Sequence, residues 1–131
     1  MIGLDTNVLV RYLTQDDPEQ SERANKLIET WCSKDEPGRV SLVVLCELVR
    51  VLRGAYGYEK HLLIRALQQI LSTTELEVES QQVARSALSA FRRGGADFAD
   101  YVIVVANHVS GCEATYSFDQ KLGKHPLVLE P

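Results

Sequence analysis

The fold is decided by the first stretch of the chain, Met1-Ile2-Gly3-Leu4-Asp5-Thr6-Asn7-Val8-Leu9-Val10-Arg11-Tyr12. Apolar residues lead directly into the carboxylate of Asp5. Apolar side chains then recur at the three-and-four spacing of a helix face, at Val8, Leu9, Tyr12 and Leu13. This pattern predicts a short buried strand, a turn and a helix, with Asp5 at the carboxyl end of the strand, where open α/β sheets bind ligands. Asp is also a favoured helix cap, so a purely capping role for Asp5 stays equally open.

The composition indicates a single globular domain spanning residues 1–131. Hydrophobic residues make up 45% of the chain and charged residues 24%, which is close to the globular average and excludes a disordered chain. The first strand begins without a signal-like segment, and every apolar run is too short to span a bilayer. We therefore expect a soluble, cytoplasmic protein with no membrane association.

The cysteines, the histidines and the net charge limit the kinds of functional site that the chain can contain. The 3 cysteines form no C-x-x-C pair and the 3 histidines show no ligand spacing, which argues against a disulfide framework and a zinc site. We expect Cys32, Cys46 and Cys112 to be buried or half-buried. The net charge of −4 is unexpected for a nucleic-acid binder, which usually carries a basic surface.

Helical periodicity and turn residues define the remaining elements. Further helices are expected at residues 19–32, 42–52, 58–71, 80–91 and 100–110, and short strands at 39–40, 76–78, 114–117 and 127–129. The Val/Ile run within 100–110 favours a strand by propensity, but the three-residue interval between Asp97 and Asp100 and a stop at Gly111 favour a buried helix. Helices that alternate with short strands, without hairpin turns, predict a three-layer α/β fold with a parallel sheet between helices.

Carboxylates stand out by their positions in these elements. Asp5 and Asp119 each follow a strand, and because the strands are expected to be parallel, both should emerge at the same edge of the sheet. Glu47 is the only charge within residues 42–49, in a mainly apolar helix, and a buried carboxylate needs a partner. Arg50, three residues on, offers an alternative explanation through a helical salt bridge.

Asp100 completes the set, in the first turn of its helix, where the helix dipole favours a negative charge. A capping role shared with Asp97 is the alternative. Carboxylates gathered at one point repel one another unless a cation joins them. Oxygen ligands favour Mg²⁺ or Mn²⁺, and such a site suits hydrolysis of a phosphodiester by metal-activated water. Acid neutralised in this way also accounts in part for the negative net charge.

Several motifs together resemble a PIN domain of the VapC toxin type. They are Leu4-Asp5-Thr6-Asn7-Val8-Leu9, Ser41-Leu42-Val43-Val44-Leu45-Cys46-Glu47-Leu48, Gly95-Ala96-Asp97-Phe98-Ala99-Asp100-Tyr101-Val102-Ile103 and Tyr116-Ser117-Phe118-Asp119. Each motif is weak alone, but their order and spacing extend the match from end to end. The resemblance implies a parallel sheet with helices on both faces, a Mg²⁺- or Mn²⁺-dependent endoribonuclease, a homodimer, and a VapB-type antitoxin that wraps the toxin and blocks its site.

The resemblance also assigns roles to individual acids. By this correspondence Asp5, Glu47 and Asp100 are the catalytic, metal-centred acids. Asp119 is the fourth acid of the set, and Asp97 is a supporting or additional acid.

Supporting residues follow from the same resemblance. Thr6 and Ser117 occupy positions where the family often has a hydroxyl that hydrogen-bonds the site, and Asn7 is expected to orient Asp5. Turn and capping chemistry explains Thr6 and Asn7 equally well. The family usually has a small residue after the third acid, and this chain has Tyr101 there. The departure puts the expected local packing in question, but not the assignment of Asp100.

Basic residues near these motifs are candidates for RNA phosphate contacts, which provide affinity without base specificity. We expect Arg92 and Arg93 first, then Arg11 and Lys121, although most such residues are solvated charges or helix-end cations. The first two helices are candidates for the dimer contact, at Tyr12, Leu13, Leu27 and Trp31, where core packing is an equal explanation.

Two other functions fit an acidic α/β protein. A phosphatase of the haloacid dehalogenase type has a second Asp two residues after its nucleophile, but position 7 is Asn and no matching lysine motif is evident. A non-catalytic PIN-like RNA-binding domain is disfavoured because every acid of the set is present, whereas a decayed site is expected to lack at least one.

Overall fold

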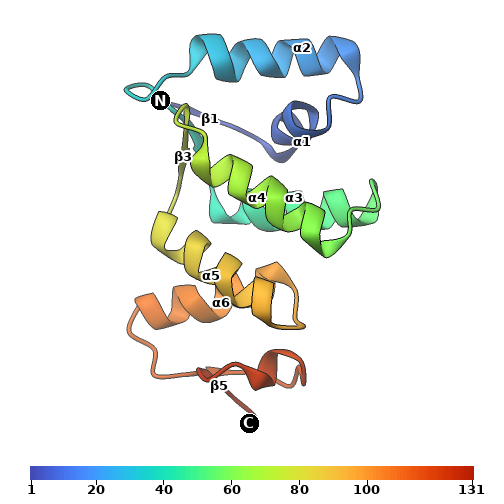
Figure 1. Cartoon of the computed structure of the whole chain (residues 1–131). Coiled ribbons are helices and arrows are strands. Elements are labelled where there is room, and N and C mark those ends of the chain that lie inside the picture. The colour runs from blue at the N-terminus through green and yellow to red at the C-terminus, as the bar shows by residue number, and fades with distance from the viewer. The chain divides into compact units, whose positions relative to one another are not determined.

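The structure is a computed structural model that describes residues 1–131 (Figure 1). The chain divides into two compact units, unit 1 at Met1–Glu79 and unit 2 at Ser80–Pro131. Together the elements give an α/β fold with a three-stranded parallel sheet and six α-helices, which confirms the expected class. No helix is long and apolar enough to cross a bilayer.

Unit 1 contains the parallel sheet, in the order β1-β2-β3. Its elements in chain order are β1 (Ile2–Gly3), α1 (Thr6–Thr14), α2 (Pro18–Lys26), the π-helical turn η1 (Leu27–Trp31), β2 (Gly38–Val40), α3 (Leu42–Gly54), α4 (Lys60–Ser72) and β3 (Leu76–Val78). Each strand is joined to the next through helices, as parallel pairing requires. Figure 1 shows α2 and η1 as one continuous coil.

Side-chain caps set where the helices of unit 1 begin. The carboxylate of Asp17 accepts a hydrogen bond from the Gln20 amide at 2.9 Å, and Pro18 occupies the first turn, where its missing N–H is not needed. The Ser41 hydroxyl caps α3 in the same way, through the Val44 amide at 3.1 Å. The core of the unit is made of fully buried aliphatic side chains, among them Leu9, Ile28, Leu45, Leu48, Leu52, Leu63, Leu67 and Ile70.

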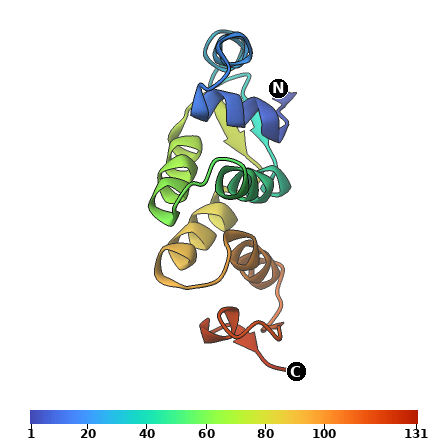
Figure 2. The ribbon, with the colours of Figure 1, turned by 90° about the vertical axis from the view of Figure 1, so that its right-hand side faces the viewer.

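Unit 2 is a helix pair followed by two short strands. Its elements are α5 (Gln81–Arg93), α6 (Phe98–Val109), β4 (Thr115–Tyr116), the 3-10 turn η2 (Leu122–Lys124) and β5 (Val128–Leu129). Helices α5 and α6 lie side by side in Figures 1 and 2. The rings of Phe91 and Phe98 join them in an edge-to-face contact with centroids 6.0 Å apart.

The expected elements are all present, and the segment rich in Val and Ile is a helix, as its flanking residues predicted. Within unit 2, strand β4 pairs in parallel with β5. Strands of two residues carry too little pattern to identify their partners from the sequence. The expectation that Asp5 and Asp119 emerge at the same edge stays a prediction.

Two expectations about burial also need correction. Cys32 is buried and Cys46 half-buried, as expected, but Cys112 is exposed, in the turn after α6. Core packing was an equal explanation for Trp31, yet 71% of its surface is exposed, so core packing does not explain this residue.

Candidate active site

Asp5 lies two residues after β1 and caps α1. Its backbone is extended, with φ −87° and ψ 162°, and its Oδ1 accepts a hydrogen bond from the Thr6 amide at 2.8 Å. The Leu4 amide donates to the Arg39 carbonyl at 3.0 Å, which holds the end of β1 against β2. Asp5 is thus fixed beyond the carboxyl end of a parallel strand, with its side chain exposed.

The residue after Asp5 links the first helix to Glu47. The Thr6 side chain is buried, and its hydroxyl donates a hydrogen bond to Oε1 of Glu47 in the second turn of α3. Asp5 and Glu47 therefore both accept a hydrogen bond from one residue, Thr6, through its amide and its hydroxyl.

The reason given for a partner at Glu47 was wrong, because Glu47 is exposed rather than buried. The buried face of α3 is formed by Leu45, Leu48, Val49 and Leu52. Glu47 points away from that face, and no ion pair joins it to Arg50. The helical salt bridge is therefore not formed, and the Thr6 hydroxyl is the contact that orients Glu47.

The donor set in unit 1 suits a hard divalent cation. Asp5 and Glu47 each keep one carboxylate oxygen without a hydrogen bond, and both side chains are exposed, so these oxygens are open to a ligand. Oxygen ligands of this kind are preferred by Mg²⁺ and Mn²⁺. Within either unit, no group of three His, Cys, Asp or Glu side chains gathers around one point. Asn7 makes no hydrogen bond to Asp5 and does not orient it.

In unit 2, Asp97 and Asp100 form a capping box at the start of α6. The Asp97 carboxylate accepts from the Phe98 amide at 2.8 Å, and Oδ2 of Asp100 accepts from the Asp97 amide at 3.2 Å. The helix begins at Phe98, two residues before the expected start, because Asp97 rather than Asp100 is its cap. Asp100 has one carboxylate oxygen left for another contact.

Tyr101, which follows Asp100, packs against Gly94, the residue directly after α5. It is buried, and its hydroxyl accepts a hydrogen bond from the Ala96 amide at 3.1 Å. The hydroxyl lies where a side chain at Gly94 would otherwise stand, since a Cβ there would be 1.9 Å from it. Glycine at position 94 therefore makes room for the large residue beside Asp100.

Ser117 and Asp119 form a small turn after β4. The Ser117 hydroxyl accepts from the Asp119 amide at 3.0 Å, and Oδ1 of Asp119 accepts from the Leu122 amide at 3.0 Å at the start of η2. Asp119 is exposed. The hydroxyl of Ser117 thus fixes the backbone that carries Asp119 rather than its carboxylate.

The basic residues selected from the sequence differ in how they are held. Arg92 and Arg93 are exposed in the last turn of α5, where cations stabilise the helix dipole, and Lys121 is exposed beside η2. Arg11 is engaged: Nη1 contacts both Asp16 carboxylate oxygens at 3.1 Å and the Tyr56 hydroxyl at 2.8 Å. The charge of Arg11 is therefore partly neutralised within the protein.

Sequence reasoning missed a groove between α1 and α2, which we call the α1–α2 groove. It has a volume of about 710 Å³ and is lined by Asn7, Val8, Arg11, Gln20, Arg23, Ala24, Lys26, Leu27 and Trp31. The signal for it lay in the helical spacing of positions 20, 23, 24, 27 and 31, which places polar, basic and aromatic side chains on one face.

The chain is similar to known proteins and to one protein family. The chain is 26% identical over 121 residues to a VapC ribonuclease from Aquifex aeolicus (strain VF5), a match that covers 92% of this chain and 89% of the relative. A chain from a toxin–antitoxin complex of Klebsiella pneumoniae matches 98% of this chain and is itself covered to 96%, at a TM-score of 0.37 and 17% identity. The model of the PIN domain family matches residues 2–126, and the chain therefore belongs to that family.

Proposed function

We propose that this protein is a Mg²⁺- or Mn²⁺-dependent endoribonuclease, the toxin of a VapBC-type toxin–antitoxin pair. The observation that carries the proposal is the linkage of Asp5 and Glu47 through Thr6, which fixes two carboxylates and leaves one oxygen of each open. Membership of the PIN family and similarity to a VapC ribonuclease support the same function.

The remaining acids of the proposed site come from unit 2. Asp100 is held at the start of α6 and Asp119 in the turn before η2, each with one carboxylate oxygen free of hydrogen bonds. We propose that residues 1–131 act as one domain in which Asp5, Glu47, Asp100 and Asp119 serve together as metal ligands, with Asp97 in support. Four carboxylates would otherwise repel one another.

The chemistry of the proposed reaction is hydrolysis of an RNA phosphodiester. A divalent ion in such a site supplies an activated water and charge stabilisation at phosphorus. The protein's own contribution is to hold the acids rigidly: Thr6 orients Asp5 and Glu47, the capping box orients Asp100, and the turn at Ser117 fixes Asp119. The proposed partners are the RNA substrate, a second copy of the chain and a VapB-type antitoxin.

The test is incubation of purified protein with total RNA in the presence of Mg²⁺ or Mn²⁺. We expect cleavage by the parent, abolished by a chelator and by Asp5→Asn or Asp100→Asn. Asp17→Asn is the matched control, because Asp17 caps α2 outside the proposed site and Asn keeps the cap. Cleavage at the parental rate by Asp5→Asn would remove Asp5 from the site.

Calorimetric titration with Mn²⁺ gives a second readout that does not depend on turnover. We expect weaker binding by Asp5→Asn and unchanged binding by Asp17→Asn. RNA binding without cleavage, and without a metal effect, would favour the non-catalytic PIN-like domain instead.

A further inference from the structure

The α1–α2 groove lies entirely within unit 1 and carries an unusual combination of side chains. Its volume of about 710 Å³ falls within the range of ligand sites in proteins. Arg23 and Lys26 line it from α2, Trp31 lines it from η1, and Asn7 and Arg11 line it from α1. Polar and apolar groups therefore face the same hollow.

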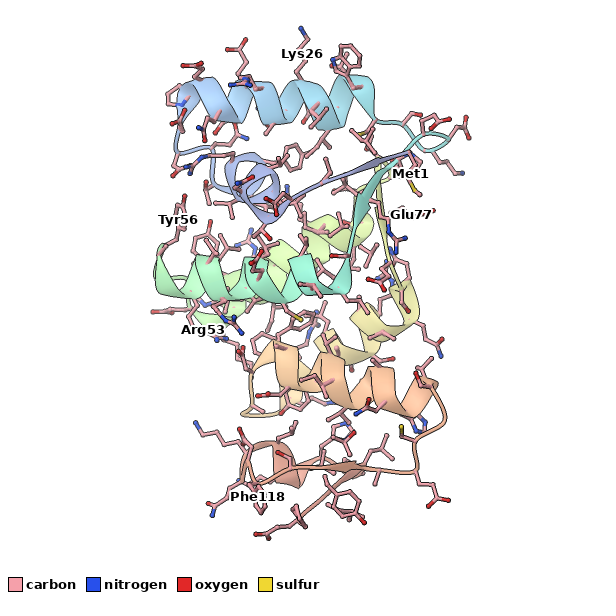
Figure 3. All side chains as sticks on the ribbon, turned by 180° about the vertical axis from the view of Figure 1, so that it is seen from behind. Met1, Lys26, Arg53, Tyr56, Glu77 and Phe118 are labelled. Atoms are coloured by element: carbon pink, nitrogen blue, oxygen red, sulfur yellow. The ribbon has the colours of Figure 1, made fainter.

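The groove is a cationic surface on an acidic protein. Arg23 and Lys26 are exposed, and neither side chain makes a hydrogen bond or an ion pair. Figure 3 shows Lys26 projecting from α2. No Asp or Glu lines the groove, although acidic residues occur elsewhere on the same helices, at Glu19, Glu22 and Glu29. Two cations without an ion pair therefore attract negative charge to this place, despite the net charge of −4.

Trp31 supplies an aromatic face beside these cations. The side chain is 71% exposed and ends the continuous coil of α2 and η1. Arg23 and Trp31 are eight residues apart, which corresponds to roughly 12 Å along a helix axis. Proteins that bind single-stranded nucleic acid combine a basic groove with aromatic side chains on which bases stack. An acidic peptide would use the cations but would leave the indole without a stacking partner.

We propose that the α1–α2 groove binds single-stranded RNA, with phosphates held by Arg23 and Lys26 and a base stacked on Trp31. The inference rests on the proposed ribonuclease function and gives its substrate a path on unit 1. The groove begins at Asn7, directly after Thr6, whose hydroxyl contacts Glu47. A strand lying in the groove therefore reaches the helix end that carries Asp5.

The test measures RNA binding without cleavage, in a metal-free buffer with chelator. Trp31 is the only tryptophan of the chain, so indole emission reports on this residue alone. We expect an unlabelled oligouridylate to quench the emission of the parent saturably. Anisotropy of a labelled oligouridylate then measures affinity in the variants, including Trp31→Ala, which has no tryptophan signal.

Trp31→Ala should weaken binding by roughly 5- to 150-fold, and Trp31→Phe should retain most of the affinity. The double variant Arg23→Ala, Lys26→Ala should bind RNA with a weaker salt dependence. The slope of the logarithm of the association constant against the logarithm of the salt concentration should be smaller in magnitude by about 1.4, because each phosphate contact on a single strand contributes about 0.7. Arg65→Ala is the matched control, because Arg65 is an exposed, unpaired cation on α4 outside the groove.

Three results would overturn the inference. The first is that RNA does not quench the Trp31 emission at all, and the second is that polyglutamate quenches it but RNA does not. The third is an emission that changes with protein concentration alone, as a second copy of the chain in the groove would cause. If the parent cleaves RNA and Trp31→Ala binds RNA as tightly as the parent, the proposed RNA site in the α1–α2 groove is wrong, but the proposed ribonuclease function is not. If RNA quenches Trp31 but is never cleaved, the groove stands and the proposed function fails.

Discussion

The hydroxyl of Thr6 donates a hydrogen bond to Glu47, a residue 41 positions further along the chain. This contact connects the start of α1 to the middle of α3, and it orients an exposed carboxylate by means of a buried side chain. Groups that orient metal-binding side chains usually affect metal affinity strongly, even without touching the ion.

The first prediction concerns Thr6→Val, which keeps the shape of the side chain and removes the hydroxyl. We expect Mn²⁺ affinity and RNA cleavage to fall by roughly 10- to 100-fold. Urea denaturation should show a loss of only about 0.5–1.5 kcal/mol, because the exposed Glu47 is rehydrated. Thr6→Ser keeps a hydroxyl and should retain most of the activity; equal activity of the Val variant would show that the contact is only structural.

The second prediction separates capping from catalysis at the start of α6. Asp100→Asn keeps an oxygen that can accept from the Asp97 amide, so the free energy of unfolding should change little while RNA cleavage is lost. Asp97→Ala removes the cap itself and should cost about 1 kcal/mol by urea denaturation. Loss of stability in Asp100→Asn comparable to that in Asp97→Ala would assign Asp100 to the cap rather than to the proposed site.

Local patterns were sufficient to locate the elements. Periodicity identified the helices, because this signal depends on residues within a few positions of each other. Strand pairing does not depend on such residues. A two-residue strand such as β4 therefore carries no local pattern that identifies its partner, β5.

The environment of Glu47 shows a second limit. Val43, Glu47 and Arg50 share the solvent face of α3, at helical spacing. Val43 is 74% exposed. Because an apolar residue lies on this solvent face, the sequence of α3 suggested a helix buried on all sides, with Glu47 as a buried charge. Exposed apolar residues are common, and one sequence alone does not reveal which they are. The contact with Thr6 joins two separate helices and has no local signature.

A third prediction concerns acid stability at the link between α1 and α3. The Tyr56 hydroxyl, 2.7 Å from Asp16, together with the Thr14 hydroxyl lowers the pKa of Asp16 from 3.8 to about 2. Figure 3 shows Tyr56 at the end of α3. Because the folded pKa lies below the unfolded one, this stabilisation is complete above about pH 4 and is lost as pH falls towards 2.

In Tyr56→Phe the pKa of Asp16 should rise towards 3.8, as measured by NMR titration of the Asp16 carboxyl carbon. The variant should also lose less stability than the parent between pH 4 and pH 2. Tyr58→Phe serves as the control, because the Tyr58 hydroxyl makes no hydrogen bond. An Asp16 titration unchanged by Tyr56→Phe would mean that this hydroxyl does not stabilise the carboxylate.

The fourth prediction concerns His125, between η2 and β5. Its Nδ1 accepts a hydrogen bond from the Leu127 amide at 3.1 Å, which requires an unprotonated nitrogen. Burial, and then the charge of Arg93, lower its pKa below 6.5. The unfolded chain therefore binds the proton more readily. The unprotonated His125 therefore stabilises the folded chain above about pH 6.5, and this contribution is lost as pH falls through the lowered pKa of His125.

His125→Asn should keep an acceptor for the Leu127 amide without a titrating group. Its thermal midpoint should therefore fall less than that of the parent between pH 7.5 and pH 5. Arg93→Gln should raise the pKa of His125, measured by NMR. The same acid response in His125→Asn and in the parent would rule out His125 as its source.

The last prediction tests how unit 2 accommodates Tyr101 beside Asp100. A Cβ at Gly94 would lie 1.9 Å from the Tyr101 hydroxyl and 2.8 Å from Cζ, and the buried ring cannot move freely. Gly94→Ala should therefore lower the free energy of unfolding by about 1–3 kcal/mol in urea, as overpacking does. Gly123→Ala, with open space around the added methyl, is the control and should be close to neutral.

A double-mutant cycle identifies the atom that clashes. Tyr101→Phe alone should be destabilising by about 1–3 kcal/mol, because the buried Ala96 amide loses its acceptor. In the Gly94→Ala background, Tyr101→Phe also removes the oxygen nearest to the new methyl. The double variant should therefore lose less free energy of unfolding than the sum of the losses in the two single variants. Strict additivity would show that Gly94 and Tyr101 do not compete for space, and that the large residue after Asp100 is accommodated in another way.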